Sequence, residues 1–303
     1  MGSYKADIKA CIVIPVYKGE LSHNEEISLQ QCLRILNQYD TYVIYPEGVK
    51  VDFGDKIKCI KVKSKYMASR RSYSDYVLSS EFYDTFKAYD YMLLYQLDAF
   101  VFEDRLMEFC DLKYDYIGAP WIYGMECHVL GKQLLYVGNG GFSLRRIEAF
   151  RQWIHGHSCD VANEKMFLME DQVIASYGSR YLNIAPVETA LKFAFNLNPV
   201  ECYERNDKNL PFGCHGWYKF EKEFWKKQIE TLGYTVEETQ DSIYADGIDW
   251  SEGFKRADML NKYFKKERID QGLSELIKNY SGTVSVFGAG TCGLSFANMI
   301  KGT

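Results

Sequence analysis

The sequence predicts an α/β fold in which helices flank a mostly parallel central sheet. Short apolar runs of strand length alternate with longer amphipathic stretches of helix length across residues 10–217. This alternation is typical of strand–helix–strand units, whose strands pair in parallel. The strongest run, YMLLYQLDAFVFE at 91–103, is apolar on both sides of Asp98 and predicts a strand buried on both faces.

Three further strands and two helices are predicted before this central run. The strands are apolar segments bounded by Pro, Gly or polar residues, at 10–16, 41–45 and 56–62. The first strand is followed by a loop at 17–22. The helices are predicted over 25–38, with Asn24 as the N-cap, and over 74–88.

The elements predicted after the central run are shorter. Helices are expected at 104–110, 147–154, 167–177 and 218–232, and in part over 186–195. Strands are expected at 114–118 and within the glycine-rich stretch 136–146, with loops at 119–121, 155–165 and 206–217. We expect residues 1–220 to form one domain and residues 221–280 to form a helical extension.

Composition and charge exclude several classes of protein. The net charge is −5, and Lys and Arg do not form the clusters that bind the phosphate backbone in nucleic-acid-binding proteins. We therefore expect no nucleic-acid partner. No run of 18 apolar residues predicts a transmembrane segment, and the N-terminus lacks a signal-peptide pattern. The nine Cys form no C-x-x-C pair, which indicates reduced thiols in a cytoplasmic protein.

Asp98 is the first candidate site residue. A carboxylate between apolar runs needs a partner or a position at the end of its strand. In open α/β sheets, ligands bind beyond the carboxyl ends of the strands. A lone Asp at this position is suited to a hard cation that also holds phosphate oxygens. The alternative is a buried Asp that caps a turn or a helix.

Five motifs follow one another in an order that resembles a known family. They are IPVY at 14–17, QLDAF at 96–100, GNGGFSLR at 138–145, EDQ at 170–172 and FGCHGW at 212–217. This order is similar to that of the nucleotide-sugar glycosyltransferases of the GT-A fold. It most resembles a bacterial group of predicted glycosyltransferases with these same motifs. The resemblance implies a GT-A-like central sheet over most of residues 1–220.

The resemblance also implies a divalent cation, Mn²⁺ or Mg²⁺, that bridges the oxygens of the leaving diphosphate. Most such enzymes place two acids in a D-x-D motif, but here Gln96 stands in the first position and Asp98 in the second. His215 matches a position where this fold often supplies a histidine to the metal. The alternative for His215 is a hydrogen-bonded loop histidine.

Asp171 resembles the acid that serves as the general base in inverting members, with Glu170 as a neighbour that positions the acceptor or the backbone. We expect the dipole at the start of a helix to favour the ionised form of Asp171. The alternative is that both acids only add charge to the first turn of the helix.

The resemblance further implies a set of donor-binding residues: Pro15, Val16, Tyr17 and Pro46 beside the base and ribose, Tyr73 on the diphosphate side, Gln96 and Leu97 after the central strand, and Gly140 and Gly141 against the sugar. Arg70 and Arg71 are candidates for pairing with phosphates, and Trp121 and Trp217 for stacking on the acceptor. The alternatives are ordinary strand ends, a tight turn, surface arginines and core tryptophans.

The implied function is transfer of a sugar from a nucleotide-diphosphate donor to a saccharide or lipid-linked saccharide acceptor. The resemblance implies inversion at the anomeric carbon, and a role in bacterial surface polysaccharide synthesis at the inner face of the membrane. One alternative is a nucleotidyltransferase, which usually carries a Gly-rich basic loop after the first strand, where this chain has only KGEL at 18–21. The other is a non-catalytic sugar- or nucleotide-binding module.

The C-terminal stretch TVSVFGAGTCG at 283–293 resembles the opening of a dinucleotide-binding unit. Such a unit needs a second strand with an acid about 20 residues further on, and only residues 294–303 follow here. We expect 281–303 to begin a further Rossmann-like unit, or to form a strand and helix that dock on the body or on a partner. We assign no NAD.

Overall fold

The structure is a computed structural model that describes residues 8–54, 57–127, 133–165 and 168–238. The chain divides into two compact units, Met1–Glu237 and Glu238–Thr303. The predicted extension beyond residue 238 and the glycine-rich stretch at 283–293 lie outside the described residues. None of the helices within the described ranges is long and apolar enough to cross a membrane.

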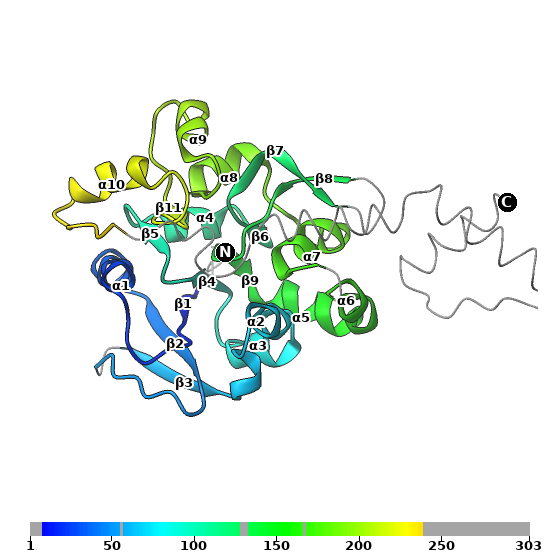
Figure 1. Ribbon diagram of the computed structural model, residues 1–303. Helices are drawn as coiled ribbons and strands as arrows, with labels where there is room; N and C mark the ends of the chain where they lie inside the picture. Colours follow the sequence, from blue (N-terminus) through cyan, green and yellow to red (C-terminus); the bar gives the residue numbers. More distant parts are fainter. Residues whose placement is uncertain (1–7, 55–56, 128–132, 166–167, 239–303) are drawn as a thin grey trace, which may run out of the picture. The chain divides into compact units, whose positions relative to one another are not determined.

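The first unit is built on a six-stranded sheet with the order β3–β2–β1–β4–β9–β6 (Figure 1). Its strands are β1 (Ala10–Pro15), β2 (Asp40–Pro46), β3 (Lys58–Val62), β4 (Tyr91–Tyr95), β6 (Tyr116–Ile117) and β9 (Phe142–Arg146). The first four strands in the spatial order run parallel, and β9 is antiparallel to both of its neighbours. The predicted α/β class with a mostly parallel sheet is therefore confirmed, and β4 lies inside the sheet.

Helices pack on both faces of the sheet because successive strand residues point to opposite sides. Cys11 and Val13 share one core with α2 (Arg70–Val77), α3 (Ser80–Thr85), α5 (Ile147–Gly156) and α7 (Glu170–Ser176). Ile12 and Ile14 share the other core with α1 (His23–Ile35), α4 (Leu106–Asp111) and α8 (Val187–Phe193). The remaining helices are α6 (Ser158–Glu164), α9 (Pro199–Arg205) and α10 (Lys222–Glu230), with 3-10 turns at Ser64–Tyr66 and Gly178–Arg180.

A second, three-stranded sheet continues from the central run. The chain turns after β4 and resumes as β5 (Ala99–Val101), which pairs antiparallel with β11 (Gly213–His215). In turn, β11 pairs with β10 (Ala194–Phe195). The register places His215 opposite Ala99, and the backbone N–H groups of Gly216 and Trp217 donate to the carbonyl of Asp98. Residues more than 100 positions apart therefore meet at the carboxyl end of β4.

The predicted loop at 119–121 is wrong. Pro120 begins strand β7 (Pro120–Cys127), which forms a hairpin with β8 (Gln133–Val137). A proline is tolerated at the first position of a strand because that position can lack an N–H. The predicted loop at 155–165 is also wrong, because α6 forms there and buries Val161 and Glu164.

Helix boundaries differ from the prediction where serines act as caps. Ser22, not Asn24, caps α1 and forms a capping box with Glu25. Asn24 instead donates from Nδ2 to the carbonyl of Glu237. The single helix predicted over 74–88 is divided into α2 and α3, since the Ser79 hydroxyl accepts from Phe82 N–H and starts the second helix.

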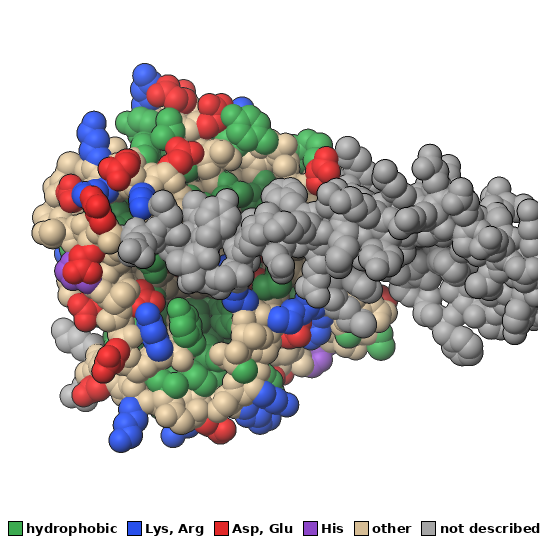
Figure 2. Space-filling view, viewed as in Figure 1, with side chains coloured by type: hydrophobic (Ala, Val, Ile, Leu, Met, Phe, Trp, Pro, Cys, Tyr) green, Lys and Arg blue, Asp and Glu red, His purple; other side chains and the backbone are tan. Residues whose placement is uncertain are grey.

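Acidic and basic side chains are interspersed over the visible face of the described residues (Figure 2). Both tryptophans predicted as stacking candidates are core residues, since Trp217 is 0% and Trp121 is 4% exposed. Trp217 packs in the core beneath the small sheet together with Trp225.

Trp217 and Trp225 offer a matched test of this core. Both are fully buried, but Trp217 Nε1 donates to Ser28 Oγ at 2.9 Å, whereas Trp225 Nε1 has no acceptor among the described residues. We expect Trp217→Phe to lower the free energy of unfolding by about 1–3 kcal/mol more than Trp225→Phe, because it leaves a buried hydroxyl unpaired. Urea unfolding measures both, and equal losses would show that this hydrogen bond contributes nothing.

Candidate active site

Asp98 lies in the turn directly after β4 and is only 7% exposed. Its Oδ1 is 3.0 Å from Nε2 of His215, and its Oδ2 is 3.0 Å from Nζ of Lys219. Burial alone would raise the pKa of this carboxyl, but the charges of His215 and Lys219 outweigh burial and hold the pKa well below its usual range. Asp98 is therefore an ionised carboxylate with a partner on each oxygen.

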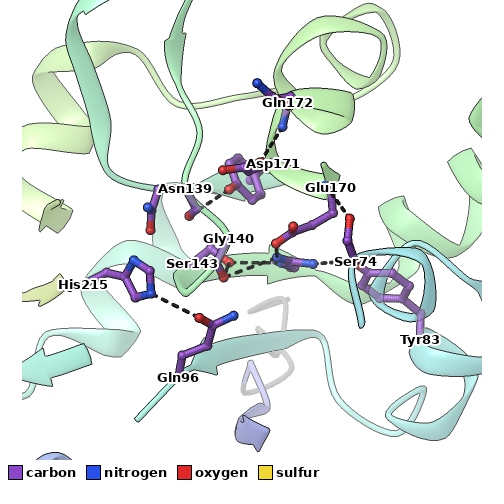
Figure 3. A network of polar contacts seen from close by, with 12 residues as sticks. Ser74, Tyr83, Gln96, Asn139, Gly140, Ser143, Glu170, Asp171, Gln172 and His215 are labelled. Atoms are coloured by element: carbon purple, nitrogen blue, oxygen red, sulfur yellow. Dashed lines mark hydrogen bonds and ion pairs between the residues drawn. The ribbon is translucent and has the colours of Figure 1, made fainter. Parts of the chain in front are cut away.

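His215 is held on both ring nitrogens. Asn196 Nδ2 lies 3.2 Å from Nδ1 of the ring and donates to the backbone carbonyl of His215 at 2.9 Å. Nε2 faces Oε1 of Gln96 at 3.1 Å (Figure 3). It also lies 3.0 Å from Oδ1 of Asp98. Three candidate donor atoms, from Gln96, Asp98 and His215, thus converge on one point.

The loop of residues 138–141 between β8 and β9, called the glycine loop, lies between two groups of polar side chains (Figure 3). A Cβ atom on Gly141 would lie 2.0 Å from Nε2 of His215, and one on Gly140 would lie 1.7 Å from Oε1 of Glu170. Only glycine fits at these two positions. The loop is tied to the turn after β4, since Gln96 N–H donates to the carbonyl of Gly141 at 2.8 Å.

Glu170 and Asp171 begin α7 on the other side of this loop. Glu170 is 7% exposed, and its Oε1 lies 3.5 Å from Nη2 of Arg145. Its backbone N–H donates to Ser74 Oγ at 2.8 Å, which ties α7 to α2. Burial and then the charge of Glu170 raise the pKa of Asp171 to about 7. The expected preference of the helix dipole for ionised Asp171 is therefore outweighed.

The residues predicted beside the base and ribose lie at the carboxyl ends of β1 and β2. Pro15, Val16 and Pro46 are buried, whereas Tyr17 is 64% exposed. Leu97 is 7% exposed in the turn beside Asp98.

Helix α2 carries Arg70, Arg71 and Tyr73, which are candidates for the diphosphate side of the site. The hydroxyl of Tyr73 is buried towards Gln96 and Glu170, and burial raises its pKa above the usual value. Arg71 pairs with Asp75 at 3.4 Å, and Arg70 is exposed.

Four residues of the site are not evident from the motifs alone. Lys219 follows His215 by four positions, and Asn196 directly follows β10 of the small sheet. Asn139 has a left-handed backbone with φ 62° and is 8% exposed, and its Oδ1 has no hydrogen-bond partner within the part of the chain described. Arg145 is the last residue of GNGGFSLR and is fully buried.

The side chains around Asp98 include possible ligands for a divalent cation. Nowhere in the described ranges do three or more His, Cys, Asp or Glu side chains gather as metal ligands. Asp98 and His215 do converge, with the amide oxygen of Gln96 beside them. A hard cation is commonly held by one or two protein carboxylates together with substrate phosphates and water. The residues present therefore fit a cation that binds together with a diphosphate.

Gly141 provides a test of the close approach in the site. Gly141→Ala should displace the His215 imidazole from Asp98 and lower the free energy of unfolding by about 1–3 kcal/mol. Gly156→Ala, where a Cβ would meet no atom within 4 Å, is the matched control. Imidazole ¹⁵N resonances, with His215 assigned by His215→Asn, measure the displacement. An unchanged His215 resonance in Gly141→Ala would contradict the geometry.

Comparison with curated proteins finds no match. Among solved structures, an active-site mutant of LgtC is similar at 14% identity and a TM-score of 0.48, covering 75% of this chain and 97% of that chain. GlyE of Streptococcus pneumoniae, a glycosyltransferase, has 13% identity and a TM-score of 0.44, covering 86% of this chain and 64% of its own. Mouse xyloside xylosyltransferase 1 has 13% identity and a TM-score of 0.46, covering 69% and 98%.

A family model described as "Protein of unknown function (DUF5672)" matches residues 56–215, which include β4, the glycine loop, α7 and His215. The match spans more than half of the chain, and the protein belongs to this family.

Proposed function

We propose that the protein is a glycosyltransferase that moves a sugar from a nucleotide-diphosphate donor to a hydroxyl of a saccharide acceptor. One observation carries the proposal: two differently charged groups of side chains lie on the two sides of Gly140–Gly141. Asp98, His215 and Lys219 form the first group, and Glu170 and Asp171 form the second. The motif resemblance of residues 10–217 supports the same function.

The first group is suited to the diphosphate of the donor. Lys219 places a positive group beside Asp98, where the leaving diphosphate would gain negative charge. Asp98, His215 and the amide oxygen of Gln96 would hold the cation. When bound, Mn²⁺ or Mg²⁺ stabilises the charge of the leaving diphosphate, and the imidazole nitrogen favours Mn²⁺.

The second group is suited to the acceptor. A general base works best when its pKa lies near the working pH, and the pKa of Asp171 is raised to about 7. Asp171 takes the proton of the acceptor hydroxyl while the oxygen bonds to the anomeric carbon and the diphosphate leaves with the bonding electrons. One in-line displacement of this kind inverts the anomeric configuration.

A lipid-linked saccharide is the acceptor that an adjacent cavity favours. The cavity has a volume of about 410 Å³ and is lined by Leu134, Tyr136, Ala175 and Pro186, among others. Two of its walls lead towards the site, since α7 begins with Glu170–Asp171 and β8 runs into the glycine loop, whereas residues 184–188 form a third wall. Ala175 is one helical turn from Asp171 on the same face, about 6 Å along the axis. An acceptor sugar at Asp171 would place an apolar group in this cavity, in keeping with a role at the inner face of the membrane in surface polysaccharide synthesis.

The nucleotidyltransferase alternative has weaker support. Lys18, the single lysine of the loop after β1, lies 2.6 Å from Glu25 at the start of α1. This lysine forms an ion pair at the start of α1, which does not favour a phosphate-binding role for it.

Asp98→Asn tests the donor side. A nucleoside diphosphate with Mn²⁺ should raise the melting temperature of the wild type by binding the folded state. EDTA should remove this increase, and so should Asp98→Asn, which takes away the charged ligand. Asp207→Asn is the control, because Asp207 is exposed and its positive φ of 54° suits Asn. A full Mn²⁺-dependent increase in Asp98→Asn would show that Asp98 is only structural.

Asp171→Asn tests the acceptor side. Loss of a general base should lower kcat by roughly 10²–10⁴ while donor affinity changes little. In the wild type the rate should rise with pH through about 7 as Asp171 loses its proton, and this acidic limb should vanish in the variant. NMR of the product should show inversion at the anomeric carbon. Retention would leave Asp171 as a residue that only positions the acceptor.

A further inference from the structure

Arg145 is a fully buried cation directly beneath the glycine loop. Its Nε donates to Ser143 Oγ at 3.0 Å and its Nη1 donates to Tyr83 OH at 3.1 Å. Its Nη2 reaches the carbonyl of Gly140 at 3.4 Å and Oε1 of Glu170 at 3.5 Å. The guanidinium therefore joins β9, α3, the glycine loop and α7 at one point.

The charge of Arg145 requires a counter-ion, because an isolated buried cation is very costly. Within the described residues, Glu170 is the carboxylate that forms an ion pair with it. The other Arg145 partners are neutral hydroxyls and a backbone carbonyl. Glu170 is thus the group whose negative charge Arg145 fixes.

The geometry points to Arg145 as a positioning residue that pairs with the Glu170 carboxylate and holds the Gly140 carbonyl, so that Asp171 is the carboxylate that exchanges the proton. This role of Arg145 rests on the proposed function in one respect, which is that the proton comes from the acceptor hydroxyl. It also predicts how Asp171 is protonated, and this can be measured without any transfer reaction.

The groups around Asp171 support this division of roles. Glu170 from α7 and Arg145 from β9 are the charges that act on it, with the charge of Glu170 having the larger effect. The titratable hydroxyls that face this cluster are Tyr73 from α2, Tyr83 from α3 and Tyr116 from β6, and burial raises the pKa of each, so that all three are neutral near pH 7. Arg145 and Glu170 pair with each other, and burial together with the charge of Glu170 raises the pKa of Asp171.

The test is a carboxyl ¹³C NMR titration of protein labelled at aspartate, with the Asp171 resonance assigned by Asp171→Asn. In the wild type the midpoint should lie near pH 7. Glu170→Gln keeps the shape and a hydrogen-bond acceptor but removes the charge, so the midpoint should fall by at least about one pH unit. An unchanged midpoint in Glu170→Gln would overturn the role assigned to this pair.

Arg145 itself is tested by a single and a double variant. Arg145→Met leaves Glu170 buried without its counter-ion, so its melting temperature should fall sharply or the protein should fail to fold. Arg145→Met combined with Glu170→Gln removes both charges, which buried pairs tolerate better. It should recover folding and keep the Asp171 midpoint below that of the wild type. A double variant no more stable than Arg145→Met would contradict the ion pair.

Arg146→Met is the matched control. Arg146 is the next residue of the same strand, but it pairs with Asp115, and its side chain is 46% exposed. The Asp171 midpoint should stay near pH 7 in this variant. A fall as large as that in Glu170→Gln would show that any loss of charge on β9 disturbs Asp171, and would remove the special role of Arg145. If these results hold but no transfer is found, the proposed function fails and the Arg145 assignment stands.

Discussion

The buried carboxylate of Asp98 is the constraint on which the candidate site depends. An ionised group at the end of an interior strand is stable only when charged or hydrogen-bonded partners surround it. His215 and Lys219 are brought there from more than 100 residues away. The antiparallel pairing of β5 with β11 brings this segment next to Asp98. The Asp98 carbonyl accepts hydrogen bonds from two backbone N–H groups of the turn that follows β11. The small sheet therefore satisfies the charge of Asp98 and builds the site in the same step.

The glycine loop separates two carboxylates whose environments act in opposite directions. On one side, neighbouring positive charge holds the pKa of Asp98 well below its usual range despite burial. On the other, burial and a negative neighbour raise the pKa of Asp171 to about 7. Pairs of acids with opposed shifts are a common means of dividing charge stabilisation from proton transfer within one site. Gly140 and Gly141 allow both groups to lie against the same short stretch of backbone.

Much of the sheet could be predicted because its strands are continuous apolar runs. The existence of β1, β2, β3 and β4 could be predicted from such runs, whereas their order in space could not. The hairpin β7–β8 could not be predicted in the same way, since Pro120 and Gly124 within β7 resemble a loop. Helix α6 was missed because SCDVANE carries a single strongly apolar residue.

The motifs indicated Asp98, His215, Glu170 and Asp171 as candidate site residues, and the fold places them on the two sides of the glycine loop. Their partners were not predictable for specific physical reasons. Arg145 looks like a surface residue in sequence, because arginine is almost never fully buried without a partner. Lys219 reaches Asp98 only through the turn after β11, and Asn196 reaches His215 through the pairing of β10 with β11. Such contacts depend on strand register, which a local pattern does not encode.

Release of nucleoside diphosphate from a panel of nucleotide sugars tests the central claim most directly. The purified chain would be incubated with each donor and Mn²⁺, with and without an excess of EDTA. We expect that at least one donor is turned over, that EDTA suppresses the release, and that a suitable saccharide acceptor increases it. A folded protein that binds and turns over none of these donors in Mn²⁺ would contradict the assignment of this site to sugar transfer.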